Sequence, residues 1–221
     1  MKASAVIGRA QKILMDQSGK TWSEDELLEH LTAAQRAVIT IKPSAYTKNE
    51  TMQLEEGVKQ ESPGHRLYRV VRNMGTDGES PGRAVRRTDE DTLSRFRPDW
   101  ASARQRTEIR HWMRDSNEPH VFYVDPPSDG KGHVEVAIAA YPDAVESKND
   151  ELSLGEHYEP ALTAYVVGAA LSKESDAQAV KVAQFYSESF NQLVAADVEA
   201  KNRWDPRGAM RRQRGMTNDE D

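Results

Sequence analysis

The spacing of apolar residues changes twice along this chain, and that change constrains the fold more than any other feature of the sequence. Apolar residues recur every three or four positions up to Pro43, at about every second position from Tyr46 to Leu154, and again at helical spacing from Pro160. A period near 3.6 is typical of amphipathic helices, and a period of two is typical of half-buried strands. Because helices and strands are segregated along the chain, we predict an α+β fold.

Two helices are predicted before Pro43. The first covers residues 3–16 and ends before Gly19. The second begins at Ser23, which forms a capping box with Glu26, since both side chains can satisfy free amide groups at a helix start. Pro43 ends this helix. Its apolar stripe consists of Leu27, Leu31, Ala34, Val38 and Ile41.

The strongest strand signals in the middle of the chain are residues 120–127 and 133–142. In the second, Val134, Val136 and Ile138 alternate with residues that point to the other face. The connection between them, residues 125–133, is rich in Pro, Asp and Gly and is predicted to be a loop. Weaker strand candidates are residues 50–56, 63–75 and 82–87, and residues 63–75 also fit a short helix.

One short helical turn is expected inside this middle segment, within residues 88–100. We expect Thr88 to cap it and Leu93 and Phe96 to face inward. Asp89, Glu90 and Asp91 stand at its predicted start, where carboxylates favour the helix dipole.

Two further helices are predicted after the β-rich segment. Pro160 suits the first turn of a helix. Ser175, with Gln178 as its side-chain partner, is predicted to cap a long helix that runs to about Lys201. The inward faces are predicted to contain Leu162, Tyr165, Val166 and Ala169 in the first helix, and Ala179, Ala183, Tyr186, Phe190 and Leu193 in the second.

This order of elements predicts N- and C-terminal helices that pair as a small helical bundle, with a β-rich domain inserted between them. We assign residues 1–43 and 156–201 to the bundle, residues 44–155 to the inserted domain, and residues 202–221 to an extended C-terminal arm. The arm has no apolar periodicity and contains Pro206, Gly208 and Gly215.

No pattern in the sequence indicates catalysis, a metal or a cofactor. The chain contains no Cys, and its six His residues do not have the spacing of zinc ligands. The Gly-rich residues 75–82 lack the Lys-Ser/Thr pair of a phosphate-binding loop. We therefore expect a protein that is not an enzyme, with no catalytic residue, metal or cofactor.

An Arg-rich stretch with interleaved Trp residues, residues 83–114, has two interpretations. Arg with aromatic residues is typical of nucleic-acid binding and also of protein interfaces. Acidic residues are mixed into the stretch and no helix-turn-helix pattern accompanies it, which favours an interface. The candidate subunit-interface residues are Arg95, Arg97, Trp100, Arg110 and Trp112.

The net charge of −6 argues against a general attraction to nucleic acid or to anionic membranes. No apolar run approaches the roughly 20 residues of a membrane span. The N-terminus lacks the features of a signal peptide, so we expect synthesis in the cytoplasm and no membrane partner.

The C-terminal arm has the composition of a docking segment. Residues 201–214 contain six basic residues and one acidic residue, together with Trp204 and Met210. Trp and Arg are frequent anchors where proteins meet, and a flexible segment can order on a partner. The candidate docking residues are Arg203, Trp204, Asp205, Pro206, Arg207, Met210, Arg211, Arg212 and Arg214.

Several phrases, in their order, resemble the head-to-tail adaptor proteins of tailed bacteriophages, also called connector or gatekeeper proteins and, in short-tailed phages, tail tubular protein A. The phrases are RVVRNMG, GRAVRRTDEDTLSRFRPDW, FYVDPP, VEVAIAAYP, YEPALTAYVVGAALSKESD and KVAQFYSESFNQL. The resemblance covers about residues 1–195.

The resemblance implies a structural protein of the virion at the portal vertex, the head-tail junction, without catalytic residues. It implies a dodecameric ring below the portal protein, a C-terminal arm that reaches into the portal, tail, nozzle or tail-tube proteins on the other side, and a lumen through which DNA passes. A net negative subunit suits such a conduit, because strong phosphate contacts would hinder passage.

Two alternatives stay open at this point. One is a DNA-binding protein that uses residues 83–114. The other is a tail-associated peptidoglycan hydrolase, which needs two carboxylates facing each other across a groove. Its candidate carboxylates are Asp89, Asp91 and Asp143.

Overall fold

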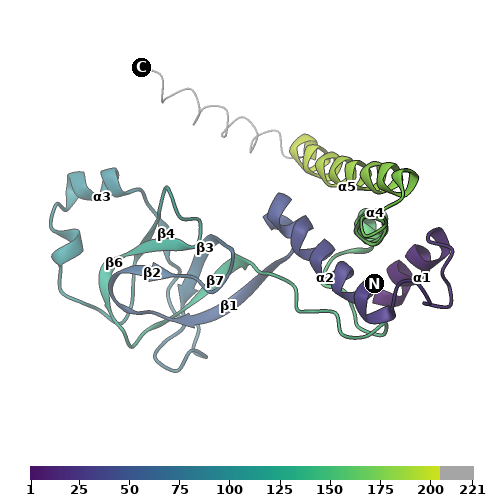
Figure 1. The fold of residues 1–221 in the computed structure, drawn as a ribbon. Helices are drawn as coiled ribbons and strands as arrows, with labels where there is room; N and C mark the ends of the chain where they lie inside the picture. Colours follow the sequence, from purple (N-terminus) through teal and green to yellow (C-terminus); the bar gives the residue numbers. More distant parts are fainter. Residues whose placement is uncertain (205–221) are drawn as a thin grey trace, which may run out of the picture. The chain divides into compact units, whose positions relative to one another are not determined.

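The computed structural model describes the backbone of residues 1–204 and the side chains of residues 1–199 (Figure 1). This part of the chain contains five α-helices and two β-sheets, which confirms the predicted α+β class. It divides into two compact units. The helical unit consists of Met1–Lys42 and the chain from Pro142 onward, and the β unit consists of Pro43–Tyr141.

The first two helices of the helical unit are α1 (Ala3–Ile13) and α2 (Glu24–Ile41). The predicted cap of α2 is confirmed, because the Ser23 hydroxyl accepts a hydrogen bond from the Glu26 amide at 3.2 Å. Helix α1 ends three residues earlier than predicted. Met15 has a left-handed backbone with φ of 55°, and the Asp16 carboxylate accepts hydrogen bonds from the next loop, including one from the Trp22 amide at 2.9 Å.

The other two helices of this unit are α4 (Glu159–Leu171), which follows the short 3-10 turn η3 (Glu156–Tyr158), and α5 (Ala177–Trp204). Helix α4 is buried on most sides because α1, α2 and α5 all pack against it. The prediction that Ser175 caps α5 is wrong. The Asp176 carboxylate does so, accepting hydrogen bonds from the amides of Gln178 and Ala179 at 3.0 and 3.1 Å.

The inward face predicted for α5 is confirmed at Ala183 and Phe190 and is wrong at Leu193, while Ala179 and Tyr186 are only partly buried. Ala183 and Phe190 are buried, whereas Leu193 is 43% exposed and Val194 is fully buried in its place. Position 194 lies four residues after Phe190, the spacing that keeps side chains on one face, and position 193 lies to its side.

The β unit contains two sheets. In the first, β1 (Thr47–Gln53) and β3 (Arg66–Asn73) both pair antiparallel with the central β7 (His133–Ala139). The second has the order β2–β6–β5–β4, in which β4 and β5 pair in parallel and the other pairs are antiparallel. Its strands are β2 (Glu56–Glu61), β6 (Val121–Asp129), β5 (His111–Arg114) and β4 (Arg86–Arg87). Residues 66–73 are therefore a strand and not a helix.

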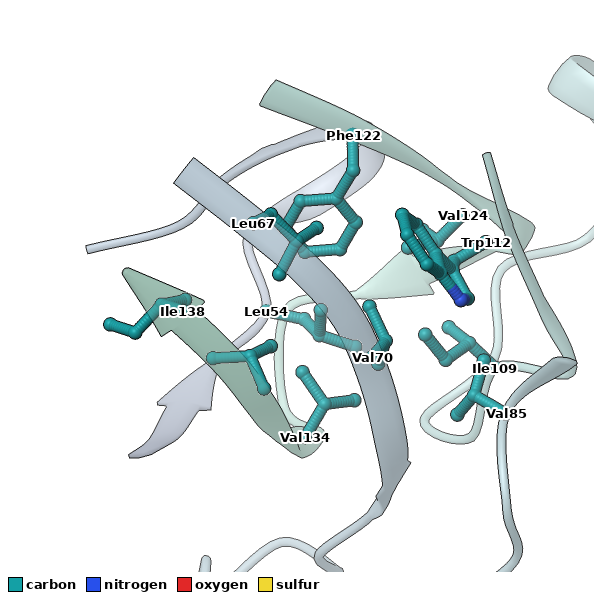
Figure 2. Close-up of a cluster of buried hydrophobic side chains, with 11 residues drawn as sticks. Leu54, Leu67, Val70, Val85, Ile109, Trp112, Phe122, Val124, Val134 and Ile138 are labelled. Carbon is teal, nitrogen blue, oxygen red and sulfur yellow. The ribbon is translucent and has the colours of Figure 1, made fainter. Parts of the chain in front are cut away.

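The main core of the β unit combines side chains from both sheets (Figure 2). The alternation predicted for β7 is confirmed, since Val134, Val136 and Ile138 are all buried. The Trp112 and Phe122 rings meet edge to face, with centroids 6.5 Å apart. The whole cluster consists of Leu54, Leu67, Val70, Val85, Ile109, Trp112, Phe122, Val124, Val134, Val136 and Ile138.

The loop predicted for residues 125–133 is wrong over its first half, because β6 continues through Pro126 and Pro127 to Asp129, with a cis peptide bond before Pro126. Proline cannot donate a hydrogen bond, but the carbonyls of this stretch still accept them. The Arg110 amide donates to the Asp125 carbonyl and the Arg106 amide donates to the Pro127 carbonyl, both at 2.8 Å.

The short helix α3 (Glu90–Phe96) begins one residue later than predicted. Its cap is Asp89 and not Thr88, since the Asp89 carboxylate accepts a hydrogen bond from the Thr92 amide at 2.8 Å. Leu93 is buried with Trp100 and Met113 in a second, smaller cluster. Phe96, predicted to face inward, is 82% exposed.

Residues 142–155 belong to the helical unit, although the apolar spacing up to Leu154 predicts that they are part of the β-rich domain. They run alongside the N-terminus. The Ala3 amide donates to the Asp150 carbonyl and the Leu152 amide to the Met1 carbonyl, at 2.9 and 2.8 Å. Within residues 1–204, no helix combines the length and the apolarity that a membrane span requires.

Candidate interaction surfaces

A groove lined by arginine residues lies on the β unit and has a volume of about 560 Å³. We call it the arginine groove. Five arginines line it together with one acidic residue, Glu108, and three small or neutral side chains. Its lining residues are Arg83, Arg97, Ala103, Arg104, Arg106, Thr107, Glu108, Arg110 and Pro126.

One wall of the arginine groove is the segment 103–110, which main-chain hydrogen bonds hold against β6. The Arg106 and Arg110 amides donate to carbonyls of β6, and the Asp129 amide donates back to the Arg106 carbonyl at 3.2 Å. Thr107 adds a hydrogen bond from its hydroxyl to the Asp129 carboxylate at 2.7 Å. The arginines of this wall therefore extend from a fixed backbone.

Asn73 joins this wall to the segment that carries Arg83. Its side chain is buried, and its amide group donates to the carbonyls of Arg83 and Ile109 at 3.0 and 2.9 Å. Its oxygen accepts from the Ile109 amide at 3.0 Å. Neither Asn73 nor its bonding role was singled out in the sequence, because its partners lie 10 and 36 residues away.

The charge of the arginine groove is largely uncompensated. Arg97 pairs with Asp125 at 3.1 Å, and the fully buried Asp125 carboxylate also meets His111 at 3.0 Å. Across the side chains that the structure describes, no ion pair or hydrogen bond reaches the guanidinium groups of the other four arginines. Counting Glu108 against them leaves a surplus of three positive charges. These four residues are Arg83, Arg104, Arg106 and Arg110.

The structure separates the residues predicted as a subunit interface into two groups. The two indoles are core residues: Trp112 packs in the main cluster, and Trp100 donates to the Ser94 hydroxyl at 3.1 Å. Both are at least 93% buried, so neither offers a surface to a partner. Arg95 and Arg110 are exposed, and Arg97 is partly exposed.

A second, more apolar groove of about 370 Å³ runs between α4 and α5. We call it the α4–α5 groove. Gly168 allows the helices to approach closely there, because a Cβ atom at this position would lie 3.3 Å from the Ala183 carbonyl oxygen. Val180 lines the groove at 39% exposure, and Phe185, also on α5, is 62% exposed. The lining residues are Tyr165, Gly168, Ala169, Ser172, Val180, Ala183, Gln184 and Ser187.

The far half of α5 is fastened by a polar cluster of Lys42, Tyr158 and Asp197. The Asp197 carboxylate pairs with the Lys42 ammonium and accepts a hydrogen bond from the Tyr158 hydroxyl. Burial would raise the pKa of Asp197, but the hydrogen bonds from Lys42 and Tyr158 outweigh it and leave that pKa lowered. Burial and the Asp197 carboxylate raise the pKa of Tyr158.

The residues of the predicted docking arm lie mostly outside the described part of the chain. Arg203 and Trp204 are the last residues of α5, so the helix extends further than the predicted end near Lys201. Asp205, Pro206, Arg207, Met210, Arg211, Arg212 and Arg214 lie outside the described residues.

The three carboxylates considered for a hydrolase lie on two different units. Asp89 caps α3, and the hydroxyl and amide of Thr92 lower the pKa of its carboxyl, whereas a general acid needs a raised pKa. Asp91 lies on α3 in the β unit, and Asp143 is exposed in the helical unit. Among the described side chains, no group of three or more His, Asp or Glu residues is arranged to hold a metal ion.

Comparison with known proteins identifies the class of protein that this fold represents. A family model described as SU10 adaptor protein matches residues 1–213, which is nearly the whole chain. The chain therefore belongs to the SU10 adaptor family of bacteriophage head-to-tail adaptors. No curated protein matches it significantly.

Proposed function

We propose that this chain is a virion subunit at the head-tail junction, where copies of it form a dodecameric ring below the portal protein. The ring connects the capsid to the tail or nozzle proteins and lets DNA pass through its lumen. The family match over residues 1–213 carries this proposal, because it spans the helical unit, the β unit and most of the C-terminal segment. No step of this function calls for a catalytic residue.

The C-terminal segment is the portal-docking element in this proposal. Helix α5 has 28 residues and continues to Trp204, at the start of the basic segment. The Lys42–Tyr158–Asp197 cluster anchors this helix seven residues before Trp204. The helix therefore presents the segment from a fixed base, which reduces the ordering cost of binding.

The ring contacts use surfaces that a single subunit leaves open. A closed ring needs two different patches on each subunit, since every copy meets one neighbour with each patch. On the helical unit, the α4–α5 groove and Phe185 offer apolar surface. On the β unit, Phe96 and the adjacent Arg95 combine an exposed aromatic ring with a charged group, the composition of an interface anchor.

Deletion of residues 202–221 tests the docking role. The shortened protein should keep the circular dichroism of the full chain, apart from the small loss due to the last three residues of α5, and should lose its affinity for purified portal protein, measured by biolayer interferometry. Trp204→Ala in the full chain should weaken docking by about 2 kcal/mol, roughly thirtyfold, as for an interface hot spot. Unchanged affinity of the deletion variant would refute the docking role.

A further inference from the structure

We propose that the arginine groove of the β unit binds the phosphate backbone of nucleic acid without reading its base sequence. The proposal adds a ligand site to the β unit and does not depend on portal docking.

The first argument is the uncompensated charge. Four guanidinium groups share one groove without an ion-pair partner in the described structure, and Glu108 offsets only one of them. Like charges held close together repel one another, and a multiply charged anion relieves this repulsion. Guanidinium groups form paired hydrogen bonds to phosphate oxygens, so a phosphate chain fits these donors.

The second argument is what the groove lacks. Ala103 and Pro126 are its apolar lining residues, and no aromatic side chain lines it. A docked peptide usually places large apolar or aromatic anchors in pockets, and base stacking needs aromatic platforms. The groove offers neither, which favours contact with the backbone phosphates alone. Such contacts position nucleic acid but carry no sequence information.

The third argument is the rigidity of the scaffold. Asn73 ties together the segments that carry Arg83 and Arg110, and β6 holds the backbone at Arg106. The cost of ordering the binding site is therefore limited mostly to the arginine side chains.

The expected binding is weak and sensitive to salt. The chain as a whole carries a charge of −6, which opposes the approach of DNA. Four arginine–phosphate contacts predict a slope of about −3 to −4 for log K against log salt on duplex DNA, and a Kd of about 10⁻⁵ M at physiological salt. Contacts of this strength hold DNA reversibly and still allow it to slide.

Fluorescence anisotropy with the full chain and labelled duplexes of two unrelated sequences tests the proposal. The variant Arg104→Gln/Arg106→Gln removes two unpaired, exposed arginines and leaves the Arg97–Asp125 pair intact. We expect it to bind at least about tenfold more weakly at 50 mM salt and to flatten the salt slope by about 2. The two sequences should bind equally well.

The matched control is Arg66→Gln/Arg69→Gln, which removes the same charge from exposed positions of β3 outside the groove. This control should keep most of its affinity for the duplex, and its slope of log K against log salt should change little. Equal losses in both variants would show a general charge effect and overturn the proposal.

A competition experiment tests whether the groove prefers carboxylates. If a short poly-glutamate peptide displaces the labelled duplex at a lower concentration than unlabelled duplex does, the groove is a carboxylate site and the proposal is overturned. The groove variant should still bind the portal protein in a separate measurement. The nucleic-acid proposal and the docking proposal can therefore be refuted independently of each other.

Discussion

The helical unit and the β unit reach a stable fold by different means. The helical unit buries small residues such as Ala34, Ala164 and Gly168, and side-chain caps fix the starts of α2 and α5. The β unit packs large side chains such as Trp112 and Phe122 between two sheets. Buried amides such as Asn73 then join its distant segments. Local signals therefore specify much of the helical unit, whereas long-range contacts specify the β unit.

The largest expected effect concerns the packing of the β unit. Trp112→Ala removes a fully buried indole from the main core and should destabilise this unit by about 3–5 kcal/mol, since the cavity collapses only in part. Native-state hydrogen exchange can resolve the units, and protection should fall in β5, β6 and β7. The control Phe185→Ala changes an exposed aromatic on α5 and should stay within about 0.5 kcal/mol. Equal effects would contradict the core assignment.

The next effect concerns the polar cluster of the helical unit. Asp197→Asn leaves the Lys42 ammonium, which is only 10% exposed, without its carboxylate, and should cost about 3 kcal/mol at pH 7. The wild-type protein gains this stability above the unfolded pKa of a carboxyl, near 4, because the folded pKa of Asp197 is lowered. The difference between the two proteins should therefore shrink as pH falls below about 4.

Urea denaturation of both proteins at pH values from 7 to 3, followed at 222 nm, measures this difference. A constant difference across the whole range would show that the cluster does not stabilise the charged form of Asp197.

The smallest expected effect comes from removing a helix cap, and it distinguishes a serine that caps a helix from one that does not. Ser23→Ala removes the hydroxyl that accepts from the Glu26 amide and should destabilise the helical unit by about 1 kcal/mol. Ser175→Ala is the matched change at a position that the sequence equally suggested as a cap, and it should have an effect below about 0.5 kcal/mol, because Asp176 caps α5. Thermal melts of the two variants make the comparison, and a larger loss for Ser175→Ala would reverse the assignment of the cap.

Much of the fold follows from the sequence because its signals are local. The capping box at Ser23 and the alternation of Val134, Val136 and Ile138 predict α2 and β7 correctly. Asp89 and Asp176 were missed as caps because each stands directly after another good cap residue, and the final choice depends on backbone geometry. The inward position predicted for Phe96 failed because a helix of two turns leaves its last residue free to face solvent.

The arginine groove was only half predictable. The sequence shows that residues 83–114 are rich in arginine, but the indoles between them suggested a mixed surface. In the folded protein, Trp112 is buried in the main cluster and Trp100 in the smaller one, whereas five arginines line one groove. That sorting depends on pairing between β5 and β6 and on Asn73, which connect residues far apart in the chain.

Cryo-electron microscopy of the intact phage particle tests the central claim most directly, namely that this chain is the adaptor between portal and tail. The account predicts a ring of these subunits at the portal vertex, with residues 202–221 lodged against the portal protein. Density for the chain elsewhere in the particle, or for residues 202–221 in solvent away from the portal, would contradict it.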